Sequence, residues 1–289
     1  MNLRPLVTLR TFIAAHAVLL LTPAYSAPVL YMGSGPDGTA ITAARDLFRF
    51  DVGGGTTVST NGLFGGIRRE INWDGVPDGF AAPNNMPLNF FNVNSPRGAV
   101  FSTPGTGVAV SANAGIAPIK FDNINPTYSQ IFKTFSAQRL FAAIGSNVVD
   151  VNFFSAGTNN AAFTSAFASI FTDVDHLNTT AIEYFDGAVS LGQFAVPVAN
   201  NGLSFLGVRF DAGERITRVR ITSGNTALGP NDGGNIDVVA MDDFLYAEPV
   251  QFRAVPEPSS LALFALGLFG CLAGCRNRRQ RVGSKRQVI

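Results

Sequence analysis

The chain has little of the chemistry that most catalytic and metal sites use. Its 289 residues include two cysteines, two histidines and one tryptophan. Both cysteines, Cys271 and Cys275, lie near the C-terminus, so the rest of the chain has neither a disulfide framework nor a cysteine metal site. His16 lies in the first 26 residues, which leaves His176 alone for a catalytic triad or a zinc site. We therefore expect a protein without enzymatic activity.

Basic residues are scarce in the middle of the chain. Between Ala27 and Val255 there are 13 Lys and Arg against 19 Asp and Glu, a net charge near −6. The remaining basic residues lie near the two ends, which is why the whole chain is almost neutral, at +1. Because contacts to a phosphate backbone depend on basic side chains, we expect no nucleic-acid partner.

Residues 1–26 have the pattern of a secretory signal peptide. Arg4 and Arg10 accompany an apolar run at 12–21, which is too short to cross a bilayer comfortably and suits the helix of a signal peptide. Small residues at positions −3 and −1 place the cleavage between Ser26 and Ala27. The pattern predicts export.

The C-terminal segment has three parts in a fixed order. The first part consists of Val255, Pro256, Glu257 and Pro258. The uncharged stretch 259–275 is about the shortest that crosses a bilayer as a helix, and we expect a transmembrane helix there. The basic tail 276–289 begins with the topology signal, Arg276, Arg278 and Arg279. Positive charge stays on the cytoplasmic side, so we expect the rest of the chain on the periplasmic side of the inner membrane.

This three-part arrangement, from Val255 to Arg279, resembles the PEP-CTERM sorting signal of Gram-negative bacteria that make exopolysaccharide. In that family the segment is the substrate of an exosortase, a membrane protease-transpeptidase. The resemblance implies export, transient anchoring, cleavage near Pro-Glu-Pro with Glu257 as the recognition residue, and transfer to the cell envelope or extracellular matrix. Pro256 and Pro258 keep the chain extended, which makes it accessible to a protease.

The part between these segments has the composition of a secreted β-protein, rich in Phe, Val, Asn, Gly and Thr. Residues 27–97 look irregular apart from a short amphipathic helix at 41–50. From Gly98 onward ten β-like runs alternate with turns, at 99–102, 107–111, 138–144, 148–154, 163–172, 179–185, 189–196, 204–210, 216–222 and 236–246. We expect an all-β, antiparallel, jelly-roll-like β-sandwich over 98–249, followed by a linker at 250–258.

Aspartates are the remaining candidates for a metal site. Asp173 and Asp175 alternate at a strand end and can point the same way, while Asp242 and Asp243 come near the end of the last long run. Asp232 and Asp237 flank a glycine-rich loop. Calcium prefers oxygen ligands, so a structural calcium ion held by Asp173, Asp175, Asp242 and Asp243 is the candidate cofactor. The alternative is that these side chains cap turns.

Trp73, with its neighbours Asn72 and Asp74, is the candidate sugar-binding platform, and the alternative is a core residue. The available glutamates Glu70, Glu183 and Glu214 show no spacing that singles out a catalytic pair. We therefore expect a cell-surface or extracellular-matrix protein with a structural, adhesive or glycan-associated role, and exopolysaccharide is a candidate partner. A carboxylate-based enzyme that acts on envelope or exopolysaccharide glycans is the alternative.

Overall fold

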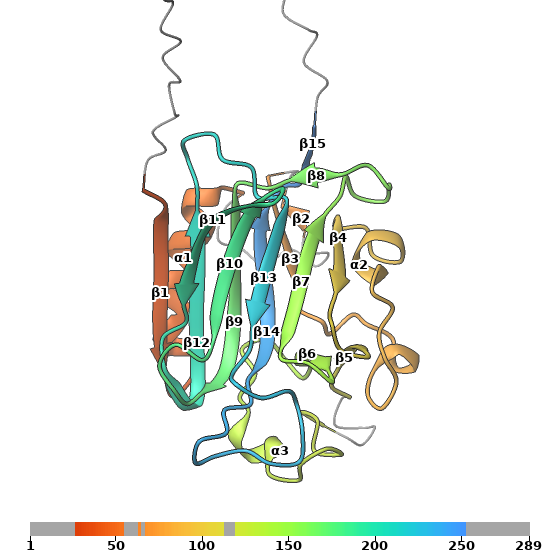
Figure 1. Ribbon diagram of the computed structural model, residues 1–289, viewed down its shortest axis with the longest axis vertical. Helices are drawn as coiled ribbons and strands as arrows, with labels where there is room; N and C mark the ends of the chain where they lie inside the picture. Colours follow the sequence, from red (N-terminus) through yellow and green to blue (C-terminus); the bar gives the residue numbers. More distant parts are fainter. Residues whose placement is uncertain (1–26, 55–62, 65–66, 113–118, 253–289) are drawn as a thin grey trace, which may run out of the picture.

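The computed structural model describes residues 27–54, 63–64, 67–112 and 119–252. They form two antiparallel sheets packed face to face, with a small two-stranded sheet at one end (Figure 1). The chain passes repeatedly from one sheet to the other, as in a jelly roll. The expectation of an all-β antiparallel sandwich is confirmed.

The larger sheet contains, in spatial order, β1 (Val29–Gly35), β12 (Ala199–Arg209), β9 (Ala166–Val174), β14 (Ala240–Ala247), β3 (Arg68–Ile71) and β2 (Leu63–Phe64), with β6 (Phe141–Ile144) and β5 (Gly107–Val110) joined through β14. The smaller sheet contains β11 (Val189–Ala195), β10 (Ala181–Asp186), β13 (Arg218–Thr222), β7 (Val148–Phe153) and β4 (Ala99–Ser102). The small sheet pairs β8 (Ala162–Phe163) with β15 (Val250–Gln251). The helices are α1 (Gly38–Val52), α2 (Phe90–Val93), α3 (Tyr128–Ile131) and the 3₁₀ helix η1 (Asp78–Phe80).

Burial patterns explain why each strand lies where it does. In β7, alternate residues Val149, Val151 and Phe153 are buried, because one face of the smaller sheet packs on the core and the other meets solvent. Every residue of β9 is buried. This strand lies in the middle of the larger sheet, whose two faces are covered by the smaller sheet and by α1.

Helix α1 covers the outer face of the larger sheet with Ile41 and Phe48, which pack on Phe205. It begins at Asp37, whose carboxylate accepts a hydrogen bond from the Thr39 amide at 2.9 Å, an N-cap. The close contact needs a glycine at position 207 of β12, since a Cβ atom there would lie 2.7 Å from the Phe48 ring. The missing side chain at position 207 therefore lets the helix pack closely on the sheet.

The segment before Gly98, expected to be irregular, is more regular than the sequence indicates. Strand β1 pairs with β12 along seven residues, and β3 pairs with β14. The expected helix at 41–50 extends to Gly38 and Val52. The sequence of strand β1, Val-Leu-Tyr-Met-Gly-Ser-Gly, shows no polar–apolar alternation, although burial does alternate along the strand. A Cβ at Gly35 would lie 2.5 Å from Ala40. Pairing with β12 and packing against α1, and not intrinsic strand propensity, therefore place these residues in a strand.

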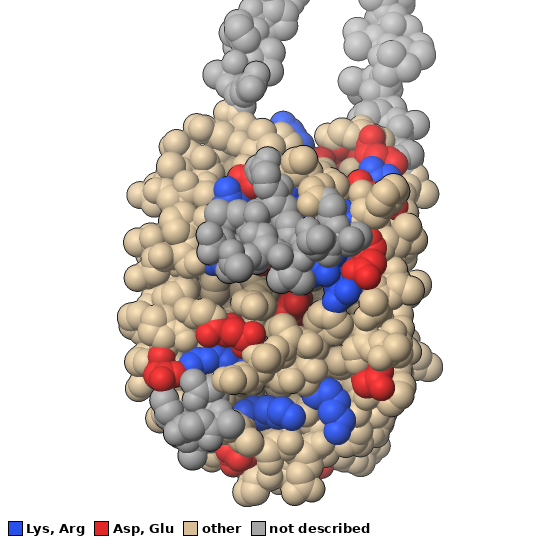
Figure 2. Space-filling view, turned by 180° about the vertical axis from the view of Figure 1, so that it is seen from behind, with Lys and Arg blue, Asp and Glu red and all other residues tan. Residues whose placement is uncertain are grey.

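The ten expected strands are all present, with shifted ends. Strand β12 begins at Ala199, five residues before the expected start, and β14 begins only at Ala240. Within the expected linker, Val250 and Gln251 form β15. The charged side chains on the face seen in Figure 2 are of both signs and lie beside one another among mostly uncharged residues.

Candidate functional site

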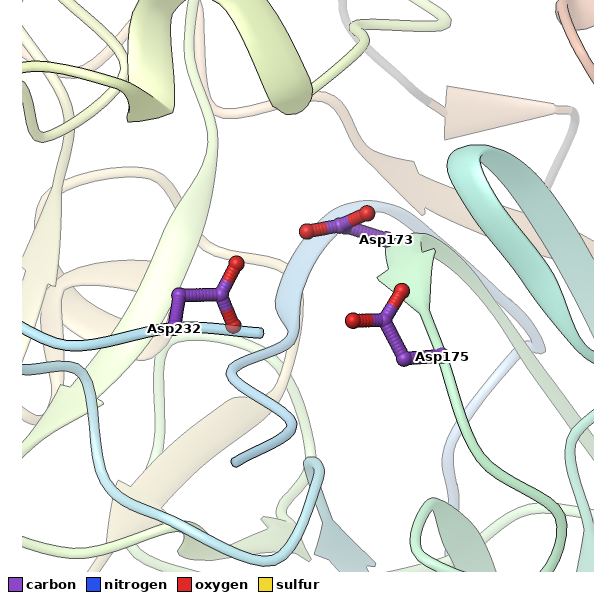
Figure 3. Close-up of side chains that lie close together, drawn as sticks. All are labelled: Asp173, Asp175 and Asp232. Atoms are coloured by element: carbon purple, nitrogen blue, oxygen red, sulfur yellow. The ribbon is translucent and has the colours of Figure 1, made fainter. Parts of the chain in front are cut away.

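Three aspartates from two segments converge at one end of the sandwich (Figure 3). Asp173 lies in the end of β9, Asp175 follows that strand, and Asp232 lies in the loop between β13 and β14. One carboxylate oxygen of each residue lies within 4.8 Å of the other two. The structure thus brings together the two aspartates expected at the end of this strand and adds Asp232.

Backbone amides hold the aspartate cluster in place. Asp173 accepts a hydrogen bond from the Asn201 amide at 2.6 Å, and Asp232 accepts one from the Val238 amide at 3.1 Å. Asp173 has a φ of 66°, a left-handed backbone conformation at the point where the strand turns. These contacts aim the carboxylates from both segments at one small volume.

A fourth aspartate, Asp237, supports the cluster from behind. Its carboxylate is fully buried and accepts hydrogen bonds from the Asp175 amide at 3.2 Å and from the Thr179 hydroxyl. Its own amide donates to Asn225 at 2.9 Å. Asp237 is therefore satisfied by protein donors and positions the segment that carries Asp175.

The electrostatics of the cluster penalise negative charge. Burial, followed by the neighbouring aspartates, raises the pKa of Asp173 to about 7, although the hydrogen bond from Asn201 opposes the shift. Burial also raises the pKa of Asp175 and Asp232. In the described part of the chain, no Lys or Arg forms an ion pair with these three residues. Within the described residues, His176 opposes the shift at Asp175, but the net shift of all three pKa values is upward.

The donor set of the cluster fits a hard divalent cation. Asp175 Oδ1 is buried, and none of the described residues donates a hydrogen bond to it. Calcium binds oxygen at about 2.3–2.6 Å, so two ligands of one ion lie at most about 5 Å apart, and the three carboxylate oxygens lie within 4.8 Å of one another. A cation here would replace the missing donor of Asp175 and offset the charge of all three residues.

Asp242 and Asp243 do not join this cluster, which corrects the expected ligand set. Both are buried in β14, and Asp242 accepts hydrogen bonds from the Phe135 amide at 2.6 Å and from Ser136 Oγ at 3.0 Å. Asp243 is 2.7 Å from the same hydroxyl. The pairing of β14 with β9 shifts its register between Met241 and Phe244, which lets two consecutive side chains reach one segment.

Trp73 is not a surface platform, which corrects the sugar-binding expectation. Its side chain is 1% exposed, stacks on Phe141 at 4.2 Å between ring centroids, and donates its indole N–H to the Asp242 carbonyl at 2.6 Å. Asn72 is exposed, whereas half-buried Asp74 accepts a hydrogen bond from the Arg139 amide at 3.1 Å. These three residues therefore belong to different environments and form no common surface.

The residues considered for catalysis have structural contacts. Glu70 is 7% exposed and accepts hydrogen bonds from Arg49 at 2.8 and 2.6 Å and from Arg68 at 2.8 Å. Glu183 accepts one from Ser190 at 2.7 Å, on the outer face of the smaller sheet. His176 lies 2.9 Å from the Gly234 carbonyl. We call the contacts of Arg49 and Arg68 with Glu70 the two-arginine clamp. No sequence pattern predicts it, because Arg49 and Glu70 are 21 residues apart.

Several expected features lie outside the described residues. These are the signal segment with its cleavage position Ser26, the motif residues Val255 to Pro258, the expected transmembrane helix 259–275 and the basic tail with Arg276, Arg278 and Arg279. Among the helices that the structure does describe, none has the length and apolar character needed to cross a membrane.

Comparison with known protein families decides the nature of the C-terminal segment. Residues 254–279 match the PEP-CTERM protein-sorting motif. The chain carries a PEP-CTERM signal. This confirms the resemblance seen from Val255 to Arg279, and the motif is consistent with an exported protein that an exosortase sorts. No curated protein and no solved structure shows a significant match to the chain.

Proposed function

We propose that this PEP-CTERM protein is anchored briefly in the inner membrane, released by cleavage near Pro-Glu-Pro, and then serves as a non-enzymatic structural component of the cell surface or extracellular matrix. The observation that carries the proposal is the match of residues 254–279 to the sorting motif. This motif starts two residues after Phe252, where the described sandwich ends. Cleavage there leaves every described strand intact.

The contacts of the carboxylates support a structural role over an enzymatic one. Both oxygens of Glu70 are engaged by arginines, so this residue is held as an ion-pair partner and is not presented to a substrate. Glu183 lies on the outer face of the smaller sheet and contacts a serine. A glycosidase needs two carboxyl groups that face each other across a bound sugar. The contacts of Glu70 and Glu183 therefore give the enzymatic alternative no support.

The proposal includes association with exopolysaccharide, which rests on the sorting route and not on Trp73. Its test is retention of the released protein on exopolysaccharide from the producing cell, measured by affinity electrophoresis. Retention that is lost when the polysaccharide is digested supports glycan association. Migration unchanged by the polysaccharide would remove the glycan part and leave the structural role in place.

We also propose that a divalent cation, calcium by its ligand chemistry, binds between Asp173, Asp175 and Asp232. The support is the convergence of three carboxylates, the buried Asp175 oxygen without a donor, and the lack of ion pairs to these residues in the described chain. The cation would join the end of β9 to the loop between β13 and β14. Its role is therefore stabilisation of this end of the sandwich.

The sorting step is tested in cells with and without the sorting protease. The full chain is expressed in both, and mass spectrometry maps its mature C-terminus. We expect a terminus near Pro-Glu-Pro only in cells with the protease, and its loss in the variant Glu257→Gln. The control Glu183→Gln, which changes a partly exposed glutamate of the sandwich, keeps the processing. A mature terminus at Ile289 in both strains would overturn the proposal.

The cation is tested by thermal unfolding with a chelator and with added calcium. A ligand that binds only the folded state raises the melting temperature, so the chelator lowers it and calcium restores it. The variant Asp232→Asn should lose this response. The control Asp122→Asn, in the segment that leads to α3, should keep it. An identical transition of the unchanged protein in chelator and in calcium would exclude the site.

A further inference from the structure

Both ends of the described domain lie at the same end of the sandwich. Val29, the first residue of β1, pairs with Arg209, which pairs with Ala166 at the start of β9. Close by, Phe163 pairs with Val250 of β15, the last strand. Figure 1 shows β15 and the start of β1 at one end, and α3 at the other. We call the first the exit end.

The aspartate cluster marks the opposite end. Asp173 lies near the end of β9, seven positions along the strand from Ala166. At about 3.3 Å per residue, these seven steps separate the two ends by roughly 23 Å. The two ends are therefore distinct surfaces that cannot face the same plane.

The length of the tether limits how the domain can stand on a membrane. Six residues, 253–258, separate Phe252 from the start of the expected span at Ser259. Fully extended, they reach at most about 20 Å, and the lipid headgroups take up roughly 5–7 Å of that reach. The tether is too short to raise the exit end roughly 23 Å above the lipid. The domain cannot stand on the end with the aspartate cluster.

Several exposed apolar side chains lie at the exit end and favour a position flat on the lipid. They include Leu30, Ile67, Val189, Val250 and Phe252, each between 38% and 66% exposed. An open cavity of about 410 Å³, with Phe154, Arg218 and Phe252 in its wall, lies at the same end. A lipid surface accommodates exposed apolar side chains better than bulk water does.

A basic side chain accompanies the apolar ones. The Arg215 guanidinium lies 5.4 Å from the centre of the Phe252 ring, and its side chain is half exposed. It also pairs with Asp186 at 3.2 Å, which fixes its position at the exit end. Arginine near a bilayer buries its apolar stem while its charged group contacts the headgroups.

We propose that, before cleavage, the exit end lies on the phospholipid surface, with Val189, Val250 and Phe252 at the headgroups and the aspartate cluster directed away from the membrane. The inference rests on the proposed anchoring of residues 259–275. It also defines where cleavage would take place, because the Pro-Glu-Pro segment then lies between the domain and the bilayer. The end that would bind calcium faces the periplasm.

The experiment compares two labels at opposite ends of one strand. Ala188 and Leu177 are exposed residues in the turns that follow and precede β10. Each is changed to cysteine in the full chain, with Cys271 and Cys275 replaced by serine, and is given a fluorescent label. The protein is reconstituted into vesicles of phosphatidylcholine and phosphatidylglycerol that contain a lipid with a quencher on its headgroup. Trp73 emission reports that each variant is folded.

We expect severalfold greater quenching of the label at Ala188→Cys than of the label at Leu177→Cys. Equal quenching, or the reverse order, would overturn the orientation. Insertion of about twelve Gly and Ser residues after Phe252 lengthens the tether without stiffening it. Quenching at position 188 should persist, because the apolar surface itself contacts lipid, and its loss would overturn that contact. If the full chain does not float with the vesicles, the proposed anchoring fails, and the orientation with it.

Discussion

Asp242 and Asp243, consecutive residues of β14, each place a carboxylate oxygen within hydrogen-bonding distance of the same hydroxyl, Ser136 Oγ, at 3.0 and 2.7 Å. A serine hydroxyl carries one proton and can donate to one acceptor at a time. Burial first, and then the neighbouring Asp243, raises the pKa of Asp242 well above its usual range. The raised pKa favours the protonated form of Asp242 in the folded protein, and the two carboxyl groups titrate as a coupled pair.

The first prediction concerns pH. A buried carboxyl group with a raised pKa binds its proton more tightly in the folded state than in the unfolded one, whose pKa is about 4. The free energy of unfolding therefore falls as the pH rises from about 4 through the folded pKa. Asp243→Asn removes the neighbouring charge, so we expect a smaller fall. Urea unfolding at a series of pH values measures both slopes.

The Asp243→Asn prediction has a matched control in Asp122→Asn, which is remote from the pair and should keep the slope of the unchanged protein. Asp74, whose pKa is raised to about 6 by burial and further by the charge of Asp243, also responds to Asp243→Asn. The difference between the two variants therefore reports on Asp243 together with the groups it raises, Asp242 and Asp74. Parallel profiles for Asp243→Asn and the unchanged protein would show that the two carboxyl groups titrate independently.

A second prediction concerns the two-arginine clamp. Glu70→Gln leaves Arg49 and Arg68, which are 2% and 0% exposed, without their buried carboxylate. Removal of one partner from a buried ion pair costs about 3–5 kcal/mol of unfolding free energy. Glu183→Gln, at a half-exposed position, should change it by less than about 0.5 kcal/mol. Chemical unfolding measures both, and equal stabilities would show that water reaches the clamp.

The third prediction concerns Trp73. Trp73→Phe keeps an aromatic ring but leaves the buried Asp242 carbonyl without the indole donor, which costs about 1–3 kcal/mol of unfolding free energy. Phe50→Ala, at a position 70% exposed, should cost far less. Circular dichroism follows both transitions. Because Trp73 is not at the surface, retention on exopolysaccharide should be the same with either residue, and a selective loss of retention in Trp73→Phe would contradict its core position.

The fourth prediction couples calcium to pH at Asp173. Its pKa, raised to about 7 mainly by burial, means that protons and calcium compete for the cluster. Without calcium, the stability contributed by the bound proton is lost as the pH rises through 7. With calcium, the carboxylate form is stabilised, so the increase in melting temperature should be larger at about pH 8 than at about pH 5.5. Asp173→Asn should remove this difference, and a calcium response independent of pH would contradict it.

The aspartate cluster shows which part of a site a local sequence pattern can predict and which part it cannot. The alternation of Asp173 and Asp175 at a strand end placed both on one side, since neighbouring positions in a strand face opposite ways. Asp232 lies almost sixty residues later, and its approach depends on the loop between β13 and β14 returning to the end of β9. No local sequence pattern predicts that this loop lies next to the end of β9, because its position follows from the order of the strands in the two sheets.

The sequence by itself determined the sorting motif, the all-β class and the approximate positions of ten strands, because each is written in consecutive residues as charge order, apolar length or alternation. Only the tertiary structure decided that Trp73 is core, that Asp242 and Asp243 share one serine, and that the first and last strands meet at one end. Each of these depends on which distant segment covers a side chain. Burial and strand pairing across the chain, and not local propensity, set that arrangement.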